Sequence, residues 1–563
     1  MAMVRITING RELMVEAGLT VLQAAEQSGI DIPTLCHHPA VADIGACRMC
    51  LVEVAKQRAL QPACTFPVSD GMEVQTESPK VVAARKFVLE LLFSERNHYC
   101  MYCQMSGDCE LQNLAYRYGL DHWTYDRSYE PMPVDGTRRY FVLDHNRCIL
   151  CRRCIRACDE ISANHTLGTR QRGSKTMISA DFDAPFGQST CVSCGTCLQV
   201  CPTGALIDRH SAYRGREAQV ERGKTVCAAC ALGCGVDVVH RAGHVVRIEG
   251  DWDAEPSHGL LCELGRFRPL DEVRPRVTRP LVRQGGRLVE TDLATAISAA
   301  AAGLRGRRAA AIATGRAMTE TYQALAATFA TRGIWEAPVA ELGYGMAGTL
   351  ADVLDADAIV VVGADPARTH PVVAYRIRRA LDKGARLFLI DGGGEYLAPH
   401  ATKCVGDAEA ADVATIVASA TSPVVVYGAG VGPVARRELA ALSERARFIR
   451  LPQGTNALGA AAEGVGCWDG TAAVEALYVL AGDDPATPEL PQAGFRVVQS
   501  AYQSALTEGA DVVLPSPMWA ERSGHQTNLE GRVRALEAVF AAPAGVPEEA
   551  QPLTLLAEQL KRS

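Results

Sequence analysis

The chain lacks a long uninterrupted apolar segment. Its longest uncharged run, residues 413–435, contains serine, threonine, proline and several glycines. A membrane-spanning helix needs about 20 mainly apolar residues, so we expect this run to form a helix end, a loop and a strand. The N-terminus also lacks a basic stretch followed by an apolar one, so it predicts no signal peptide.

An excess of positive charge is absent as well. Lysine and arginine total 57 against 64 aspartates and glutamates, a net charge of −7, so nothing indicates nucleic-acid binding. A complete dinucleotide fingerprint is missing too. Gly428-x-Gly430-x-Gly432 follows an apolar strand, and we interpret it as a tight turn between a strand and a helix. At 563 residues the chain is long enough for several domains.

Cysteine is nearly absent after residue 262. Only Cys404 and Cys467 follow, in no recognisable metal-binding context, and we expect both to be buried apolar thiols. The other nineteen cysteines fall into five groups with short spacings. Repeated Cys-x2-Cys spacing at this density is typical of iron–sulfur ligands and is not explained by disulfides. So many thiols also need a reducing compartment, so we expect a cytoplasmic protein.

The first group predicts a [2Fe–2S] site, because four thiolates carry about the charge that this cluster needs. Its members are Cys36, Cys47, Cys50 and Cys64. A structural zinc site is the alternative, although zinc knuckles usually pair two Cys-x2-Cys units.

Two matching runs of the form Cys-x2-Cys-x2-Cys-x3-Cys predict two [4Fe–4S] clusters. In such runs the fourth cysteine binds the other cluster. The first ligand set is therefore Cys148, Cys151, Cys154 and Cys201. The second set is Cys191, Cys194, Cys197 and Cys158.

The last group has three cysteines on one loop and a fourth much later, which fits a further [4Fe–4S] cluster. Its members are Cys227, Cys230, Cys234 and Cys262. Zinc ribbons use comparable spacings, so zinc is the alternative here too.

The remaining group has only three thiolates, Cys100, Cys103 and Cys109, and needs a fourth ligand for a [4Fe–4S] cluster. His98 is the nearest candidate, and His122 is the alternative. An imidazole in place of a thiolate removes one negative charge, which should raise the reduction potential of the cluster.

After about residue 268, short apolar strands alternate with helical stretches. The helix prediction is clearest for residues 370–384. The clearest strands are predicted at residues 309–314, 358–363, 385–391, 423–428 and 446–451. This alternation predicts parallel, doubly wound sheets.

In this order, the five cysteine groups resemble those of the large iron–sulfur subunit of respiratory complex I, the NADH:quinone oxidoreductase. They equally resemble the related iron–sulfur subunits of soluble NAD-linked hydrogenases and formate dehydrogenases. The module at 227–262 resembles the cluster domain of molybdopterin oxidoreductases, and residues 360–391 resemble the dinucleotide-type domain of that family. Residues 510–534 resemble the complex I subunit, in which this fold survives without molybdenum.

The resemblance implies a multidomain protein of α+β and α/β class. The expected parts are a [2Fe–2S] ferredoxin-like domain at 1–80, a [4Fe–4S] segment with one histidine and three cysteine ligands at 81–125, a two-cluster ferredoxin domain at 126–215, a [4Fe–4S] molybdopterin-oxidoreductase-type module at 220–268 and a truncated molybdopterin-oxidoreductase-like α/β scaffold at 269–563.

Two departures from the molybdenum enzymes imply that no molybdopterin is bound. Leu264 stands where those enzymes usually have a lysine after the last cluster cysteine. Asp391-Gly392-Gly393 replaces their Asp-Pro-Arg after the central strand.

The resemblance therefore implies an electron-relay subunit of an NAD(H)-linked complex, with no catalytic residues of its own. Its expected partners are a flavoprotein that binds FMN and NAD(H), with a small [2Fe–2S] subunit, and a second catalytic subunit of hydrogenase or formate dehydrogenase type, electron-bifurcating complexes included. The alternatives are a subunit of membrane-bound complex I, a molybdenum or tungsten enzyme that oxidises formate itself, and a non-redox scaffold with vestigial metal sites.

Overall fold

The computed structural model describes residues 2–125, 131–336, 339, 346–470 and 473–562. The chain divides into two compact units, Met1–Val220 and Glu221–Ser563. Among the described residues, the helices are all too short or too polar to cross a membrane.

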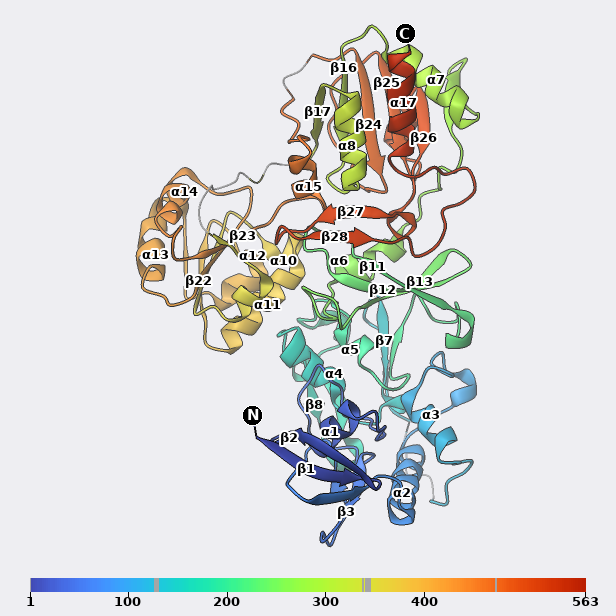
Figure 1. The fold of residues 1–563 in the computed structure, drawn as a ribbon, viewed down its shortest axis with the longest axis vertical. Coiled ribbons are helices and arrows are strands. Elements are labelled where there is room, and N and C mark those ends of the chain that lie inside the picture. The colour runs from blue at the N-terminus through green and yellow to red at the C-terminus, as the bar shows by residue number, and fades with distance from the viewer. Residues whose placement is uncertain (1, 126–130, 337–338, 340–345, 471–472, 563) are drawn as a thin grey trace. The chain divides into compact units, whose positions relative to one another are not determined.

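In the ranges described, the first unit contains short strands and five α-helices (Figure 1). The strands are β1 (Met3–Ile8), β2 (Arg11–Glu16), β3 (Leu51–Val54), β4 (Gln61–Pro62), β5 (Met72–Gln75), β6 (Val134–Asp135), β7 (Phe141–Asp144), β8 (Leu167–Arg170), β9 (Met177–Ala180) and β10 (Leu206–Asp208). The helices are α1 (Val21–Gln27), α2 (Pro79–Glu95), α3 (Glu110–Arg117), α4 (Arg153–Arg156) and α5 (Thr196–Gln199).

The N-terminal sheet has the strand order β2-β1-β5-β3-β4. It starts with a β1–β2 hairpin, whose turn residues Asn9 and Gly10 have φ values of 50° and 79°. Positive φ at both positions suits a two-residue turn that matches the twist of the strands. The sheet packs on α1, and Cys50 and Cys64 belong to the same buried core. The predicted cluster loop is thus anchored in the core of its domain.

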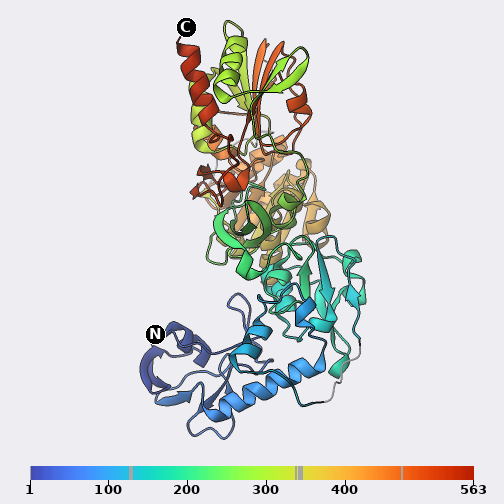
Figure 2. The same cartoon turned by 90° about the vertical axis from the view of Figure 1, so that its right-hand side faces the viewer.

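The long helix α2, the extended blue helix of Figure 2, fixes this loop through one buried side chain. The guanidinium of Arg85 donates hydrogen bonds to the carbonyl oxygens of Met49 (2.9 Å) and Leu51 (2.8 Å) and pairs with Glu77 at 2.7 Å. Because Cys50 lies between Met49 and Leu51, α2 positions a predicted metal ligand.

The second unit contains two larger sheets, a small three-stranded sheet and a pair of strands. The strands are β11 (Glu221–Val226), β12 (Gly235–Arg241), β13 (His244–Gly250), β14 (Leu281–Gln284), β15 (Arg287–Glu290), β16 (Ala309–Ala313), β17 (Thr331–Ile334), β18 (Met346–Ala347), β19 (Ala358–Val362), β20 (Arg386–Ile390), β21 (Lys403–Val405), β22 (Pro423–Tyr427), β23 (Arg447–Arg450), β24 (Ala476–Gly482), β25 (Phe495–Ser500), β26 (Val512–Pro515), β27 (Gly524–Thr527) and β28 (Val533–Leu536). The helices are α6 (Glu263–Arg266), α7 (Leu293–Leu304), α8 (Thr319–Thr328), α9 (Leu350–Leu354), α10 (Pro366–Thr369), α11 (Pro371–Asp382), α12 (Gly394–Leu397), α13 (Ala410–Val417), α14 (Pro433–Ala440), α15 (Ala457–Ala462), α16 (Ala505–Glu508) and α17 (Gln551–Lys561).

The two larger sheets are mainly parallel, as the alternation of strands and helices predicts. One has the order β15-β14-β26-β25-β24-β16-β17, and of its described strands only β14 and β15 at the edge run antiparallel to their neighbours. The other, β18-β23-β22-β19-β20-β21, is parallel throughout. All five predicted strands and the predicted helix, α11, are present, so the fold class is confirmed.

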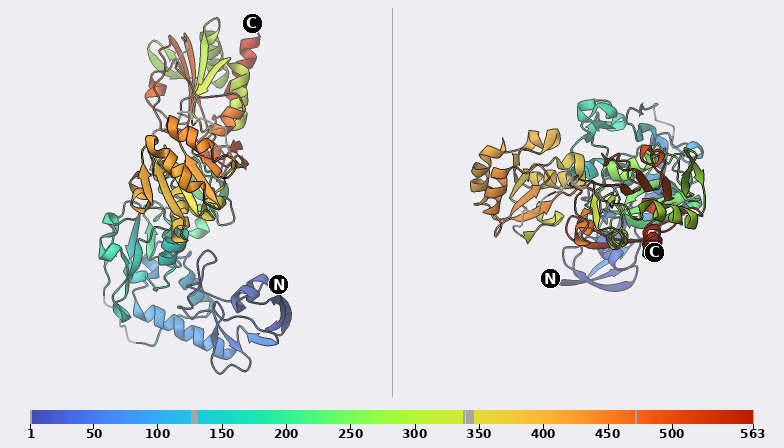
Figure 3. Two further views of the ribbon diagram at one scale, coloured as in Figure 1. Left: turned by 90° about the vertical axis from the view of Figure 1, so that its left-hand side faces the viewer. Right: turned by 90° about the horizontal axis from the view of Figure 1, so that it is seen from above.

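Helices cover the larger sheet through small residues. The buried core on one face joins α7, α8 and α17 to β16 and β24, with alanine at most of the α7 and β16 positions. Figures 2 and 3 show the red helix α17 along this sheet. Small side chains let helix and sheet approach closely, while Leu553 and Leu556 of α17 fill the remaining volume.

The predicted burial of both isolated cysteines is wrong for Cys404. Its side chain is exposed because β21, which carries it, is the edge strand of the six-stranded sheet. Cys467 is half-buried and packs against the core of the larger sheet.

Two glycine turns meet at the end of the six-stranded sheet. Gly363 follows β19 with a φ of +56°, and its carbonyl oxygen accepts a hydrogen bond from the Gly430 amide at 3.0 Å. A Cβ atom on Gly363 would lie 2.1 Å from the Gly430 carbonyl carbon. This close backbone contact explains why glycine is needed after both strands.

We predict that Gly363→Ala destabilises the second unit by about 3 kcal/mol, from left-handed backbone strain and overpacking. Urea unfolding followed by circular dichroism would measure this. Gly466→Ala is the control, because no atom lies within 4 Å of its added Cβ. Equal free energies of unfolding for the two variants would contradict the prediction.

Candidate metal centres

The predicted [2Fe–2S] cysteines lie in two pairs. The backbone amide of Cys47 donates to the sulfur of Cys36 at 3.4 Å, and the sulfurs of Cys50 and Cys64 are 3.4 Å apart. Hydrogen bonding from Cys47 and nearby backbone amides lowers the pKa of Cys36 to about 5. Because each iron of a [2Fe–2S] cluster takes two cysteine thiolates, this pairing fits such a cluster.

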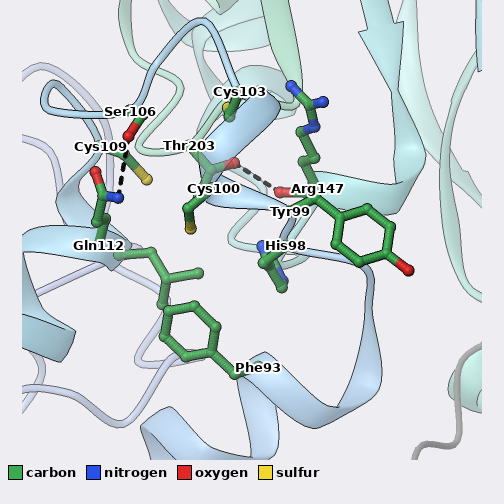
Figure 4. A pocket seen from close by; sticks show the side chains of 12 residues that line it. Phe93, His98, Tyr99, Cys100, Cys103, Ser106, Cys109, Gln112, Arg147 and Thr203 are labelled. Carbon is green, nitrogen blue, oxygen red and sulfur yellow. Dashed lines mark hydrogen bonds between the residues drawn. The ribbon is translucent and has the colours of Figure 1, made fainter. Parts of the chain in front are cut away.

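The His98 group lines one pocket (Figure 4). His98, Cys100, Cys103 and Cys109 all contribute to its walls, while Tyr99 points away from the three cysteines. Gly204 also lines the pocket, and a Cβ added to it would lie 2.6 Å from the Cys103 sulfur. The structure thus brings together all four residues of the predicted ligand set.

The environment of His98 suits a metal ligand. Its Nε2 atom is buried and has no hydrogen-bond partner among the described residues, and its ring packs edge-on against Phe93. Burial lowers the pKa of His98 to about 4, so the ring is neutral at pH 7 and can donate a lone pair. His122, the alternative, lies outside the pocket, is 75% exposed and pairs with Asp121 at 2.6 Å.

The two ferredoxin runs have matching local geometry. The Leu150 amide donates to the Cys148 sulfur and the Ser193 amide donates to the Cys191 sulfur, each at 3.4 Å. Leu150 and Ser193 both have a φ of 53°. Amide hydrogen bonds to sulfur stabilise added negative charge, so both loops would favour the reduced form of a bound cluster.

The fourth cysteine of each run lies near the other run. The charge of Cys201 raises the pKa of Cys151, while that of Cys194 raises the pKa of Cys158, in each case after burial as the main cause. Cys158 also lines a pocket with Cys191, Cys194 and Cys197. These proximities support the predicted exchange of the fourth ligands.

The last group surrounds one end of β12. The Cys227 amide donates to the Cys234 carbonyl oxygen at 2.8 Å, and Cys262 precedes α6. A Cβ on Gly265 would lie 2.6 Å from the Cys227 sulfur, so glycine leaves room for the ligand loop.

Two arginines approach this group, and the cysteine spacing gave no sign of them. Arg316, which follows β16, donates to the carbonyl oxygen of Ala228 at 3.5 Å and pairs with Asp484. Arg376 of α11 is 9% exposed and donates to the Ser257 carbonyl oxygen at 2.9 Å. Burial lowers the pKa of Arg376, and the negative charge of Cys234 opposes that shift. Both cations favour negative charge on the group.

Several buried thiols resist ionisation unless a cation is bound. At the five thiols named next, burial is the largest cause of the raised pKa, and repulsion from neighbouring thiolates adds to it. The pKa rises to about 11 for Cys148 and Cys191, and to about 12 for Cys109, Cys158 and Cys230. A coordinated metal removes this barrier, because it deprotonates a thiol outright.

Within the described ranges, no three His, Cys, Asp or Glu side chains converge closely enough to hold a single metal ion.

The second unit has a helix end of the kind that binds phosphate in dinucleotide folds, but a carboxylate occupies it. Asp407 accepts hydrogen bonds from the amides of Val434 (3.0 Å) and Ala435 (2.7 Å) in the first turn of α14. Its own amide donates to Asp391 at 2.8 Å. The protein's own anions fill this site, so a bound nucleotide phosphate does not fit there.

Five family models match the chain. They describe a 2Fe-2S iron-sulfur cluster binding domain at residues 1–79, an NADH-ubiquinone oxidoreductase-G iron-sulfur binding region at 85–123, a ferredoxin-like domain of NADH-quinone oxidoreductase subunit 3 at 140–207, a molybdopterin oxidoreductase Fe4S4 domain at 221–269 and molybdopterin oxidoreductase at 276–431 and 450–550.

Similar proteins cover different shares of the chain. NADH-quinone oxidoreductase subunit 3 of Thermus thermophilus is 30% identical over 99% of this chain and 83% of its own length. A G-type subunit of the NADH-quinone oxidoreductase of Rhizobium meliloti is 33% identical over 67% of this chain, and the chain spans only 46% of that relative. Among solved structures, an NAD+-reducing [NiFe]-hydrogenase in the H2-reduced state matches 38% of this chain and 90% of its own, with 33% identity and a TM-score of 0.36.

We predict that His98→Cys keeps the cluster of the Cys100 group and lowers its reduction potential, because a thiolate adds negative charge. A redox titration followed by electron paramagnetic resonance (EPR) would measure the shift. His122→Cys is the matched control and should leave the potential unchanged. An unaltered potential and spectrum in His98→Cys would show that His98 does not bind iron.

Proposed function

Because the chain belongs to the family of large iron–sulfur (G-type) subunits of NADH-quinone oxidoreductase, we propose that it is an iron–sulfur electron-relay subunit of a multisubunit NAD(H)-linked oxidoreductase. The family resemblance found in the sequence is confirmed, and 2Fe-2S and 4Fe-4S binding domains are present. The observation that carries the proposal is the grouping of nineteen cysteines and His98 at five places in the fold. One [2Fe–2S] and four [4Fe–4S] clusters would fill them.

Each bound cluster would accept and release one electron at a time. The chain's own residues set how readily that happens. Cysteine thiolates hold the metal, neutral His98 lowers the negative charge of its group, and the amides of Leu150 and Ser193 stabilise added electron density. The chain thus supplies ligation, charge and burial, and no catalytic side chain.

The partners follow from electron counting. NADH gives up two electrons as a hydride, so a flavin must divide them before single-electron carriers can take them. We place FMN and NAD(H) on a flavoprotein partner that docks near the N-terminal cluster region, together with a small [2Fe–2S] subunit. A hydrogenase or formate dehydrogenase subunit is the proposed second catalytic partner.

A quinone-reducing complex is the second candidate, because the relatives that show the family are named as NADH-quinone oxidoreductase subunits. Purification of the native complex and identification of its subunits distinguishes the two. A hydrogenase or formate dehydrogenase subunit supports the first candidate, and membrane subunits support the second.

The C-terminal half serves as a scaffold and docking surface without molybdopterin. Leu264 offers no charge beside the last cysteine group. Asp407 accepts from the first amides of α14, where a nucleotide phosphate would bind, and Asp391 accepts from the Asp407 amide. An anionic dinucleotide placed there would meet carboxylates instead of free amides, which is strongly unfavourable.

We predict that the purified chain carries about 18 iron atoms and gains NADH-dependent dye reduction only when the flavoprotein partner is added back. Anaerobic iron and sulfide analysis and a dye-reduction assay, with and without the partner, would measure both. The partner without this chain is the control. Stoichiometric zinc with little iron would contradict the relay, and NADH oxidation by the flavin-free chain would reveal a nucleotide site.

We also predict no molybdenum, tungsten or pterin in this chain when it is purified without its partners. Metal analysis and fluorescence of the oxidised pterin would check this, with a molybdopterin enzyme purified in parallel as the positive control. Near-stoichiometric pterin would favour the formate-oxidising alternative over the scaffold.

A further inference from the structure

One buried side chain reaches the loops of two different predicted clusters. Arg156, at the end of α4, is 7% exposed. One terminal nitrogen of its guanidinium donates to the carbonyl oxygens of Cys36 at 2.5 Å and Cys151 at 3.2 Å. The other terminal nitrogen donates to the Ala42 carbonyl oxygen. Cys36 belongs to the [2Fe–2S] group and Cys151 to the first ferredoxin group.

The position of Arg156 on its helical segment explains this reach. The segment comprises α4 and the single π-helical turn Ala157–Ile161. Cys154 and Cys158, four residues apart, belong to the two ferredoxin clusters. Arg156 and Glu160 are also four residues apart. Each lies two residues after one of these cysteines, so their side chains point to the opposite side of the helical segment. A carboxylate oxygen of Glu160 accepts a hydrogen bond from the Ala42 amide at 2.7 Å. The side chains of Arg156 and Glu160 therefore both bind the [2Fe–2S] loop through hydrogen bonds.

Arg156 has no carboxylate partner within the part of the chain that the structure describes. Its neighbour Arg153 has one, since Glu110 pairs with it through two hydrogen bonds of 2.6 and 2.8 Å. A buried cation that only carbonyl oxygens surround is costly unless negative charge lies nearby. The charge of Arg156 also lowers the pKa of Cys36, so its field reaches a ligand sulfur.

We propose that Arg156 is a positioning residue that clamps the [2Fe–2S] loop to the first ferredoxin loop and raises the reduction potential of both centres. The proposal rests on the proposed relay function. The planar guanidinium holds the two loops in a fixed relation, because its donors point in set directions. Its charge compensates the negative charge of both clusters and is in turn stabilised by them.

Two substitutions separate the clamp from the charge. Arg156→Gln removes the charge and most of the hydrogen-bond donors. Arg156→Lys keeps the charge but replaces the planar guanidinium, whose donors point in fixed directions, with a single ammonium group. Arg152→Gln is the matched control, because this arginine immediately precedes α4 and its side chain is exposed. The full chain would be purified anaerobically and its iron content measured first. EPR redox titration then gives the midpoint potentials, and spin relaxation of the reduced [2Fe–2S] centre reports its magnetic coupling to the neighbouring [4Fe–4S] centre.

Arg156→Gln should lower the equilibrium constant for one-electron reduction of both centres by roughly tenfold, a shift of about 59 mV to more negative potential. Arg156→Lys should restore most of that shift, and both variants should weaken the magnetic coupling because the loops move apart. Arg152→Gln should change neither, since solvent and salt screen an exposed charge.

Wild-type potentials and coupling in Arg156→Gln would overturn the proposal. If Arg156→Gln fails to retain its clusters, Arg156→Lys provides the test. Wild-type magnetic coupling in Arg156→Lys would show that Arg156 does not clamp the two loops together. Failure of the relay itself is distinguishable, because it would appear as missing iron or missing partner-dependent reduction in the unsubstituted chain.

Discussion

The burial of many thiols close together is the constraint on which the N-terminal fold depends. Without a bound cation, burial and mutual repulsion hold most of the thiol pKa values high, so the groups cannot ionise by themselves. Metal binding would release those protons and would then contribute to the folding free energy of these domains. The cysteine loops have little regular secondary structure, and contacts with neighbouring elements stabilise them. The loop that carries Cys50, for example, accepts two hydrogen bonds from Arg85 of α2.

The groups differ in the charged and polar side chains and amides that surround them. A neutral His98 lies with three cysteines in one group, backbone amides donate to sulfurs in the ferredoxin runs, and Arg316 and Arg376 approach the last group. Nearby charges and hydrogen bonds of this kind set the reduction potentials of similar clusters to different values. A chain of centres can then favour one direction of electron flow without any change in the metal chemistry.

Local sequence patterns predicted the fold well where neighbours in sequence are neighbours in space. The parallel strands β16, β19, β20, β22 and β23 follow from apolar runs. Cys404 was missed because exposure depends on the order of strands in the sheet, which no local pattern contains. Arg376 was missed for the same reason, since it lies far along the chain from Cys234. Arg156 stands inside a cysteine run, but only the structure shows that it faces the other loop.

The Asp407 carboxylate caps the first turn of α14, and this cap has a consequence for folding. The first amides of a helix need an acceptor from the protein, from water or from a ligand. Here the acceptor is a residue of the same chain, and its own amide donates to Asp391. The amides of Val434 and Ala435 therefore need no bound ligand, so this end of the six-stranded sheet can fold without one.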